Sequence, residues 1–153
     1  MNTFFTELDK TELDKILEYP NCFGCGKNNP NGLQLIFRHQ GDALVTDFTP
    51  GGTHEGWPGI VHGGIISTLL YEVMENLAYR NGTVAMMRDM EVNFRRPAKI
   101  GRRITAVARF ELSSDREMSV TATLVQNNLV AEGSARLVAL NNEQIARLGI
   151  TQT

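Results

Sequence analysis

The stretch that decides the fold reads Gly59-Ile60-Val61-His62-Gly63-Gly64-Ile65-Ile66-Ser67-Thr68-Leu69-Leu70. It places a histidine and two glycines at the start of a strongly apolar helix. Glycine has no Cβ atom, so a ligand can approach the backbone of Gly63 and Gly64 closely. The first N–H groups of a helix lack partners within it and form the positive end of its dipole. This helix start is therefore a candidate site for an anion or a polarised carbonyl oxygen.

The residues after the glycines predict one long helix, from Ile65 to Arg80. Five apolar residues recur with helical spacing and form one continuous face, namely Ile66, Leu69, Leu70, Val73 and Leu77. Asn81-Gly82 then provides the residues that a helix end favours. A helix with such a face must be covered by another layer, so we expect it to be central and buried.

Segments with strand character lie on both sides of this helix. Leu33 to Arg38 and Ala43 to Phe48 predict a hairpin around Gly41-Asp42. Four more strands are expected after the helix, at residues 84–95, 102–112, 117–126 and 129–139. Helices do not alternate with strands, which excludes a doubly wound α/β protein. The pattern predicts an α+β fold with an antiparallel sheet wrapped around one long central helix.

The two ends of the chain have a different character. Residues 1–20 contain the pentad Thr-Glu-Leu-Asp-Lys twice and predict a short N-terminal helical extension that ends before Pro20. Residues 21–141 are assigned to the main domain, and residues 142–153 to a C-terminal tail.

Composition limits the classes of partner. The chain has 153 residues, 42% of them hydrophobic, which suits one domain with a substantial core. A net charge of −2 gives no broad basic surface for nucleic acid or an anionic membrane. No apolar run reaches the roughly 20 residues that a membrane span needs. We expect a cytoplasmic protein with neither nucleic-acid nor membrane partners.

Cys22 and Cys25 form one Cys-x-x-Cys pair in a loop rich in Asn, Gly and Pro. A structural zinc site needs four ligands, and the three histidines, His39, His54 and His62, lack zinc-finger spacing. A thioredoxin-like pair would open a helix after a strand. The sequence therefore predicts no metal site here and favours a structural role.

Three motifs, in this order, resemble the hotdog-fold acyl-CoA thioesterases of the phenylacetate-degradation (PaaI-like) type. They are Cys22-Phe23-Gly24-Cys25-Gly26 with Asn29-Pro30-Asn31-Gly32-Leu33, then His62-Gly63-Gly64, then Phe94-Arg95-Arg96-Pro97 with Gly101. The resemblance spans roughly residues 22–140 and implies the hotdog fold and hydrolysis of acyl-CoA thioesters. It implies no cofactor, since coenzyme A is part of the substrate. It further implies a homodimer or homotetramer with sites at the subunit interface.

The resemblance also implies catalytic residues. The backbone N–H groups of Gly63 and Gly64 would bind the thioester oxygen beside His62. The family acid sits nine residues after the histidine, and here that position is Tyr71, followed by Glu72. Glu75 lies on the face of Tyr71 about 6 Å farther along the helix, whereas Glu72 is rotated from it by about 100°. Glu75 and Glu72 both remain candidates for the base.

Other residues are predicted to bind substrate. Thr68 and Tyr71 belong to a polar stripe beside the apolar face, and Met87 occupies a strand position where relatives often carry Thr. Arg95 and Arg96 belong to a basic cluster that could meet the phosphates of coenzyme A. Two alternatives stay open. One is a non-catalytic acyl-CoA-binding module, and the other is a hydratase or dehydratase of the same fold, which the segment His54-Glu55-Gly56-Trp57-Pro58 faintly suggests.

Overall fold

The computed structural model describes residues 19–150. The predicted N-terminal helix falls largely on residues 1–18 and so lies outside the described residues. The elements follow in the order β1 (Phe37–Gln40), β2 (Ala43–Phe48), the 3-10 turn η1 (Gly52–His54), α2 (Gly63–Arg80), β3 (Ala85–Phe94), β4 (Ile104–Ser113), β5 (Glu117–Gln126), β6 (Asn128–Ala139) and α3 (Asn142–Arg147).

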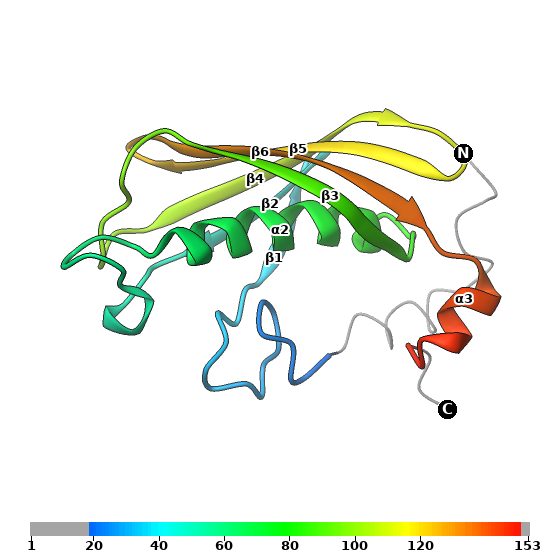
Figure 1. The fold of residues 1–153 in the computed structure, drawn as a ribbon, viewed down its shortest axis with the longest axis horizontal. Coiled ribbons are helices and arrows are strands. Elements are labelled where there is room, and N and C mark those ends of the chain that lie inside the picture. The colour runs from blue at the N-terminus through cyan, green and yellow to red at the C-terminus, as the bar shows by residue number, and fades with distance from the viewer. Residues whose placement is uncertain (1–18, 151–153) are drawn as a thin grey trace.

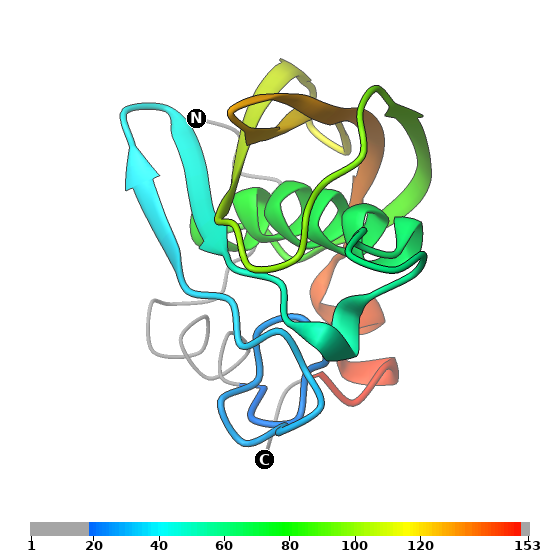
Figure 2. The ribbon, with the colours of Figure 1, turned by 90° about the vertical axis from the view of Figure 1, so that its left-hand side faces the viewer.

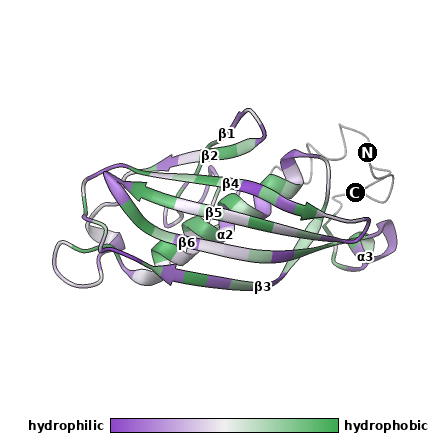
Figure 3. Ribbon diagram, turned by 90° about the horizontal axis from the view of Figure 1, so that it is seen from above, coloured by the Kyte–Doolittle hydropathy of each residue, from purple (hydrophilic) through white to green (hydrophobic). Residues whose placement is uncertain are grey.

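The six strands form one sheet in the order β1-β2-β4-β5-β6-β3, and every neighbouring pair is antiparallel. The sheet curls over α2, as predicted (Figures 1 and 2). Seen from above, the strands cross the helix and carry alternating polar and apolar residues (Figure 3). That alternation puts one face of each strand against the helix. The long strand β3 and the short strand β1 are the two edges of the described sheet.

The buried face of α2 is the predicted one. Leu69, Leu70, Val73 and Leu77 are each 0% exposed, and they pack into the main core. The helix ends where Gly82, at φ +91°, donates its N–H to Tyr79 O at 3.0 Å, and the next N–H bonds to Ala78 O. Only glycine adopts that backbone without strain. Neither α2 nor any other helix within residues 19–150 is long and apolar enough to cross a membrane.

A loop formed by residues 19–36 covers α2 on the side away from the sheet (Figure 1). Sequence analysis placed a strand at Leu33 to Arg38, but β1 begins only at Phe37. Leu33 and Leu35 are buried as their alternation suggests. Between them Gln34 has φ +52°, which interrupts the extended backbone. The alternation therefore reported burial correctly and overstated the length of the strand.

Within the segment assigned to a C-terminal tail, the structure has the short helix α3. Asn141 caps it by accepting the N–H of Gln144 at 2.9 Å, and the Gln144 side chain accepts the Asn141 N–H at 3.0 Å. This reciprocal capping box is readable in the sequence. Ile145, 1% exposed, then packs against Val84 and Leu140.

We predict that contact between α2 and the sheet dominates stability. Leu70 is fully buried, and its Cδ1 atom lies 3.4 Å from where a Cβ of Gly133 on β6 would be. Leu70→Ala should lower the free energy of unfolding by about 2–5 kcal/mol because it leaves a cavity. Leu112→Ala is the control, since Leu112 is 74% exposed, and should change it by about 0.5 kcal/mol or less. Urea unfolding of both variants measures the difference, and equal effects would contradict the assignment.

Candidate active site

The start of α2 holds one free backbone donor. His62 is the N-cap residue, and its Nδ1 atom accepts the N–H of Gly64 at 2.8 Å. Nδ1 therefore carries no proton, which leaves the hydrogen of the neutral ring on Nε2. The N–H of Gly63 has no partner among residues 19–150. Of the two glycines predicted to bind an oxygen, the structure leaves Gly63 free and engages Gly64 with His62.

The turn between β3 and β4 lies against this helix start. The Val61 N–H donates to Ala98 O at 2.9 Å, and the Ile100 N–H donates to Gly59 O at 3.1 Å. The Phe94 ring lies 3.6 Å from where a Cβ of Gly63 would be, and Phe94 is 59% exposed. An aromatic face thus borders the free N–H group.

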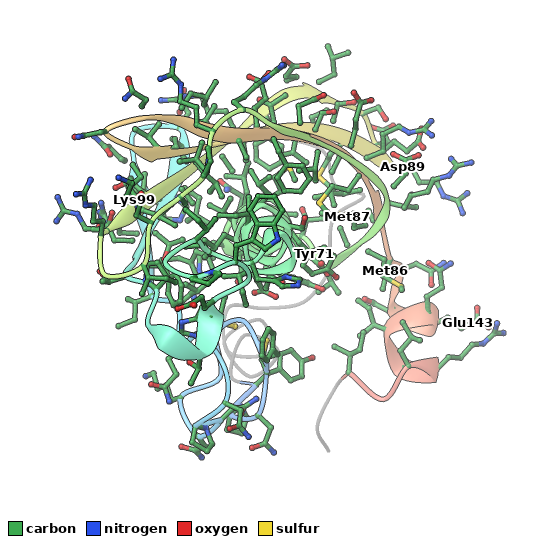
Figure 4. All side chains as sticks on the ribbon, turned by 60° about the vertical axis from the view of Figure 1, so that its left-hand side comes forward. Tyr71, Met86, Met87, Asp89, Lys99 and Glu143 are labelled. Atoms are coloured by element: carbon green, nitrogen blue, oxygen red, sulfur yellow. The ribbon has the colours of Figure 1, made fainter. Side chains whose placement is uncertain are left out.

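Cationic side chains gather on the same turn. Arg96, Lys99 and Arg102 line a cavity of about 210 Å³, and Lys99 projects outward (Figure 4). Gln126 holds this turn from β5, because its amide donates to Lys99 O and Arg102 O at 2.9 Å and accepts the Lys99 N–H at 2.8 Å. The other predicted cation, Arg95, is paired with Glu132 instead.

A polar stripe runs along α2 from this end. The Thr68 hydroxyl donates to Gly64 O at 2.8 Å. Tyr71 is 37% exposed and lies beside Glu75, whose Oε1 atom accepts the Tyr79 hydroxyl at 3.2 Å. Glu75 Oε2 is buried and has no hydrogen-bond partner among the described residues. Of the two carboxylate oxygens, Oε1 thus accepts a hydrogen bond and Oε2 is left to accept another.

Burial raises the pKa of Glu75 above its usual value, and the hydroxyls of Tyr71 and Tyr79 act in the opposite direction. The pKa of Tyr71 is also raised, chiefly by burial and then by Glu75, so the phenol stays protonated at neutral pH. A carboxylate with a raised pKa is a better proton acceptor, which suits a general base.

Glu72 points elsewhere. It is 9% exposed and faces the 19–36 loop, where a Cβ at Gly24 would lie 2.1 Å from Glu72 Cδ. Asn76 donates to Glu72 Oε2 at 3.2 Å. Burial, followed by repulsion from Glu75, raises the pKa of Glu72 to about 7, and the Asn76 hydrogen bond opposes this. The loop therefore separates this carboxylate from solvent.

Met87, the predicted substrate contact on β3, faces the core, whereas its neighbour Met86 is 48% exposed on the other side of the strand (Figure 4). The register slips between Met87 and Asp89, so β3 has a bulge there. A second and larger cavity of about 580 Å³ lies on β3, β5 and β6 and contains no residue of the helix start.

The helix start and the predicted base lie far apart along α2. With a rise of 1.5 Å per residue, Tyr71 lies about 12 Å and Glu75 about 18 Å along the axis from Gly63. One thioester cannot touch the helix start and the carboxylate of the same chain at once.

Two residues next to the site, Phe94 and Gln126, were not predicted to belong to it. Phe94 and Gln126 have no local pattern that indicates a contact with Gly63 or with the basic turn. Lys99 and Arg102 were visible as part of the charge cluster, but the sequence could not say which cations were already paired.

Residues 58–130 match the family model of the thioesterase superfamily. This match includes the helix start, α2, the basic turn and the strands β3, β4 and β5, and it confirms the resemblance to thioesterases predicted from the motifs. No curated protein sequence matches the chain.

Solved structures show the fold. A phenylacetic acid degradation-related protein of Ralstonia eutropha JMP134 has a TM-score of 0.64 and 24% identity, over 69% of this chain and 85% of that one. The PaaI protein of the Escherichia coli phenylacetic acid degradation operon has a TM-score of 0.65 and 17% identity, over 69% and 83%. A hypothetical thioesterase of Streptococcus pneumoniae TIGR4, solved with coenzyme A, has a TM-score of 0.66 and 11% identity, over 70% and 89%. The predicted α+β hotdog fold is confirmed.

We predict that His62 stabilises the helix start. His62→Ala removes the acceptor of the Gly64 N–H and should lower the free energy of unfolding by about 1 kcal/mol, the usual scale for losing an N-cap. His39→Ala is the matched control, because His39 is exposed on β1. Chemical denaturation of the two variants tests this, and an equal loss in both would show that the cap contributes nothing.

Proposed function

We propose that this protein is an acyl-CoA thioesterase that acts as a homodimer or homotetramer, with each site shared between two subunits. The observation that carries the proposal is the Gly63 N–H at the start of α2, which is free within residues 19–150 and lies beside a turn with Arg96, Lys99 and Arg102. None of these three cations forms an ion pair with another described residue. The thioesterase superfamily match and the coenzyme A bound by the Streptococcus pneumoniae neighbour support it.

The helix start would bind the reacting carbonyl. The Gly63 N–H and the positive end of the helix dipole stabilise the negative charge that forms on the thioester oxygen. Arg96, Lys99 and Arg102 would bind the phosphates of coenzyme A, since charged hydrogen bonds to phosphate are strong. The exposed Phe94 ring lies next to Gly63, and the pantetheine arm would pass over it on the way to the basic turn.

Glu75 is the carboxylate best placed to accept a proton. Glu72 is enclosed by the 19–36 loop, whereas Glu75 contacts Tyr71, which is exposed. A water that attacks the thioester carbon would pass its proton to the Tyr71 oxygen while the Tyr71 proton moves to Glu75. The bond between the carbonyl carbon and sulfur then breaks, and the coenzyme A thiolate takes the proton back from Glu75 through Tyr71, which returns both side chains to their starting state and leaves the free carboxylic acid.

The site needs two chains for geometric reasons. The helix start and Glu75 of one chain are about 18 Å apart along the axis, so the helix of a second subunit would present its Tyr71 and Glu75 to this helix start. The long edge strand β3 offers unpaired backbone groups on which such a partner could pair.

A non-catalytic acyl-CoA-binding protein is the second candidate. The specific observation in its favour is Tyr71 at the position where thioesterases of this type usually carry the acid. Such a protein would keep the helix start and the basic turn and would bind the thioester without hydrolysing it.

We predict assembly beyond the monomer. Analytical ultracentrifugation at micromolar concentration should show a dimer or tetramer, because a shared site and an uncovered edge strand both require a partner. A chain that sediments as a monomer under these conditions would contradict the shared site.

We predict that Glu75→Gln lowers kcat for acyl-CoA hydrolysis by on the order of a hundredfold or more, the scale of general base catalysis. Tyr71→Phe, which removes only the hydroxyl, should have a comparable effect if the proton passes through it. Glu111→Gln is the control, because Glu111 is exposed on β4. Steady-state assays on a panel of acyl-CoAs, with binding measured on the same panel, give the result.

The same experiment separates the two candidate functions. Binding without hydrolysis in the unmodified protein would favour the binding module, and a gain of hydrolysis in Tyr71→Asp would then show an otherwise competent site. If none of these proteins binds or hydrolyses any acyl-CoA of the panel, both candidate functions are excluded.

A further inference from the structure

We propose that Cys22, Cys25 and Glu72 form a binding site for one Zn²⁺ ion, which would tie the 19–36 loop to α2. The two Sγ atoms and a Glu72 carboxylate oxygen all lie within 4.8 Å of one another. Sequence analysis counted only cysteine and histidine ligands and found too few. The third donor comes from a helix far along the chain, and the fold brings it to the pair.

The distances suit a tetrahedral ion. Zinc binds sulfur at about 2.3 Å and carboxylate oxygen at about 2.0–2.2 Å, which puts neighbouring ligand atoms roughly 3.5–3.8 Å apart. The three atoms would need to close by about 1.3 Å at most to reach this geometry. A solvent molecule could take the fourth position, as in zinc sites with three protein ligands.

The turn around the cysteines is shaped to present both sulfur atoms. The Cys25 N–H donates to Cys22 Sγ at 3.5 Å, and the Gly26 N–H donates to Cys22 O at 2.9 Å. A hydrogen bond to sulfur orients a ligand and stabilises its thiolate form. A Cβ at Gly26 would lie 2.4 Å from Cys22 N, so no larger residue fits inside this turn.

The Glu72 carboxylate is held in place by the turn and by Asn76. Gly24, between the two cysteines, lets the Glu72 side chain lie directly on the turn, where a Cβ would be 2.4 Å from Oε2. Asn76 donates to that same oxygen at 3.2 Å and so acts as an outer-shell partner for a metal ligand. The backbone of the loop is anchored to itself by bonds such as Leu33 N–H to Phe23 O at 2.8 Å.

Charge favours a cation at this point. Two thiols and the Glu72 carboxyl group share a half-buried space. When they are ionised, the two sulfur atoms and the carboxylate repel one another, because all three carry negative charge within 4.8 Å. A divalent cation removes that conflict, and thiolate with carboxylate ligands select Zn²⁺ over Mg²⁺ or Ca²⁺. Binding would displace two thiol protons.

Zinc retention by the full chain tests the proposal. Protein kept reduced with a phosphine is loaded with zinc sulfate, dialysed against zinc-free buffer and analysed for metal. We expect equimolar Zn²⁺ in the unmodified protein and in the control variant Glu75→Gln. Glu75 lies three residues after Glu72 on the same helix and is not part of the cluster. Cys22→Ser, Cys25→Ser and Glu72→Gln should each weaken binding by about 100-fold or more, since even outer-shell changes cost up to that much.

Two further measurements do not depend on how well each variant folds. With Co²⁺ in place of Zn²⁺, the unmodified protein should show thiolate-to-cobalt charge-transfer absorption. A chelator should lower its Tm, because metal that binds only the folded chain stabilises it. An unmodified protein that retains no Zn²⁺, or that shows no charge-transfer band, would overturn the proposal. Undiminished retention in either serine variant or in Glu72→Gln would overturn it as well.

Discussion

Enclosure of α2 on two sides is the constraint on which the rest of this structure depends. The sheet covers one side and the 19–36 loop covers the other, so Leu70 and Val73 are fully buried and Glu72 is nearly so. The start of the helix, one stripe that includes Tyr71, and the last residue, Arg80, remain accessible. Any chemistry that reaches a substrate from this helix must therefore use its first backbone donors or that stripe.

The two carboxylates of α2 acquire different surroundings from the same enclosure. Glu72 and Glu75 are three residues apart, and burial raises the pKa of both. Yet Glu72 meets the Cys-x-x-Cys turn, whereas Glu75 meets two tyrosine hydroxyls. Because the environment decides what a carboxylate can do, one is suited to hold a metal ion and the other to accept a proton.

The site resembles a thioesterase at one end of the helix and departs from it in the middle. His62 caps the helix through Gly64 and leaves the Gly63 N–H without a partner among residues 19–150, and the proposed function assigns this donor to the thioester oxygen. Tyr71 replaces the acid, and Glu75 lies one turn farther on beside it. A carboxylate displaced by one turn can still exchange a proton with a substrate through an intervening hydroxyl. Whether the protein hydrolyses a thioester or only binds it therefore depends on the Tyr71–Glu75 pair.

The sequence by itself determined α2, its start and the strands β2 to β6, because these depend on local spacing. The apolar period of Ile66 to Leu77, the Gly41-Asp42 turn and the glycines after His62 all act between residues a few positions apart. The tertiary structure alone decided which groups meet. Whether Arg95 is free depends on Glu132, and whether Glu72 faces substrate or two thiols depends on a loop some fifty residues earlier in the chain. No local pattern encodes contacts over such separations, because they arise only when the sheet and the loop close around the same helix.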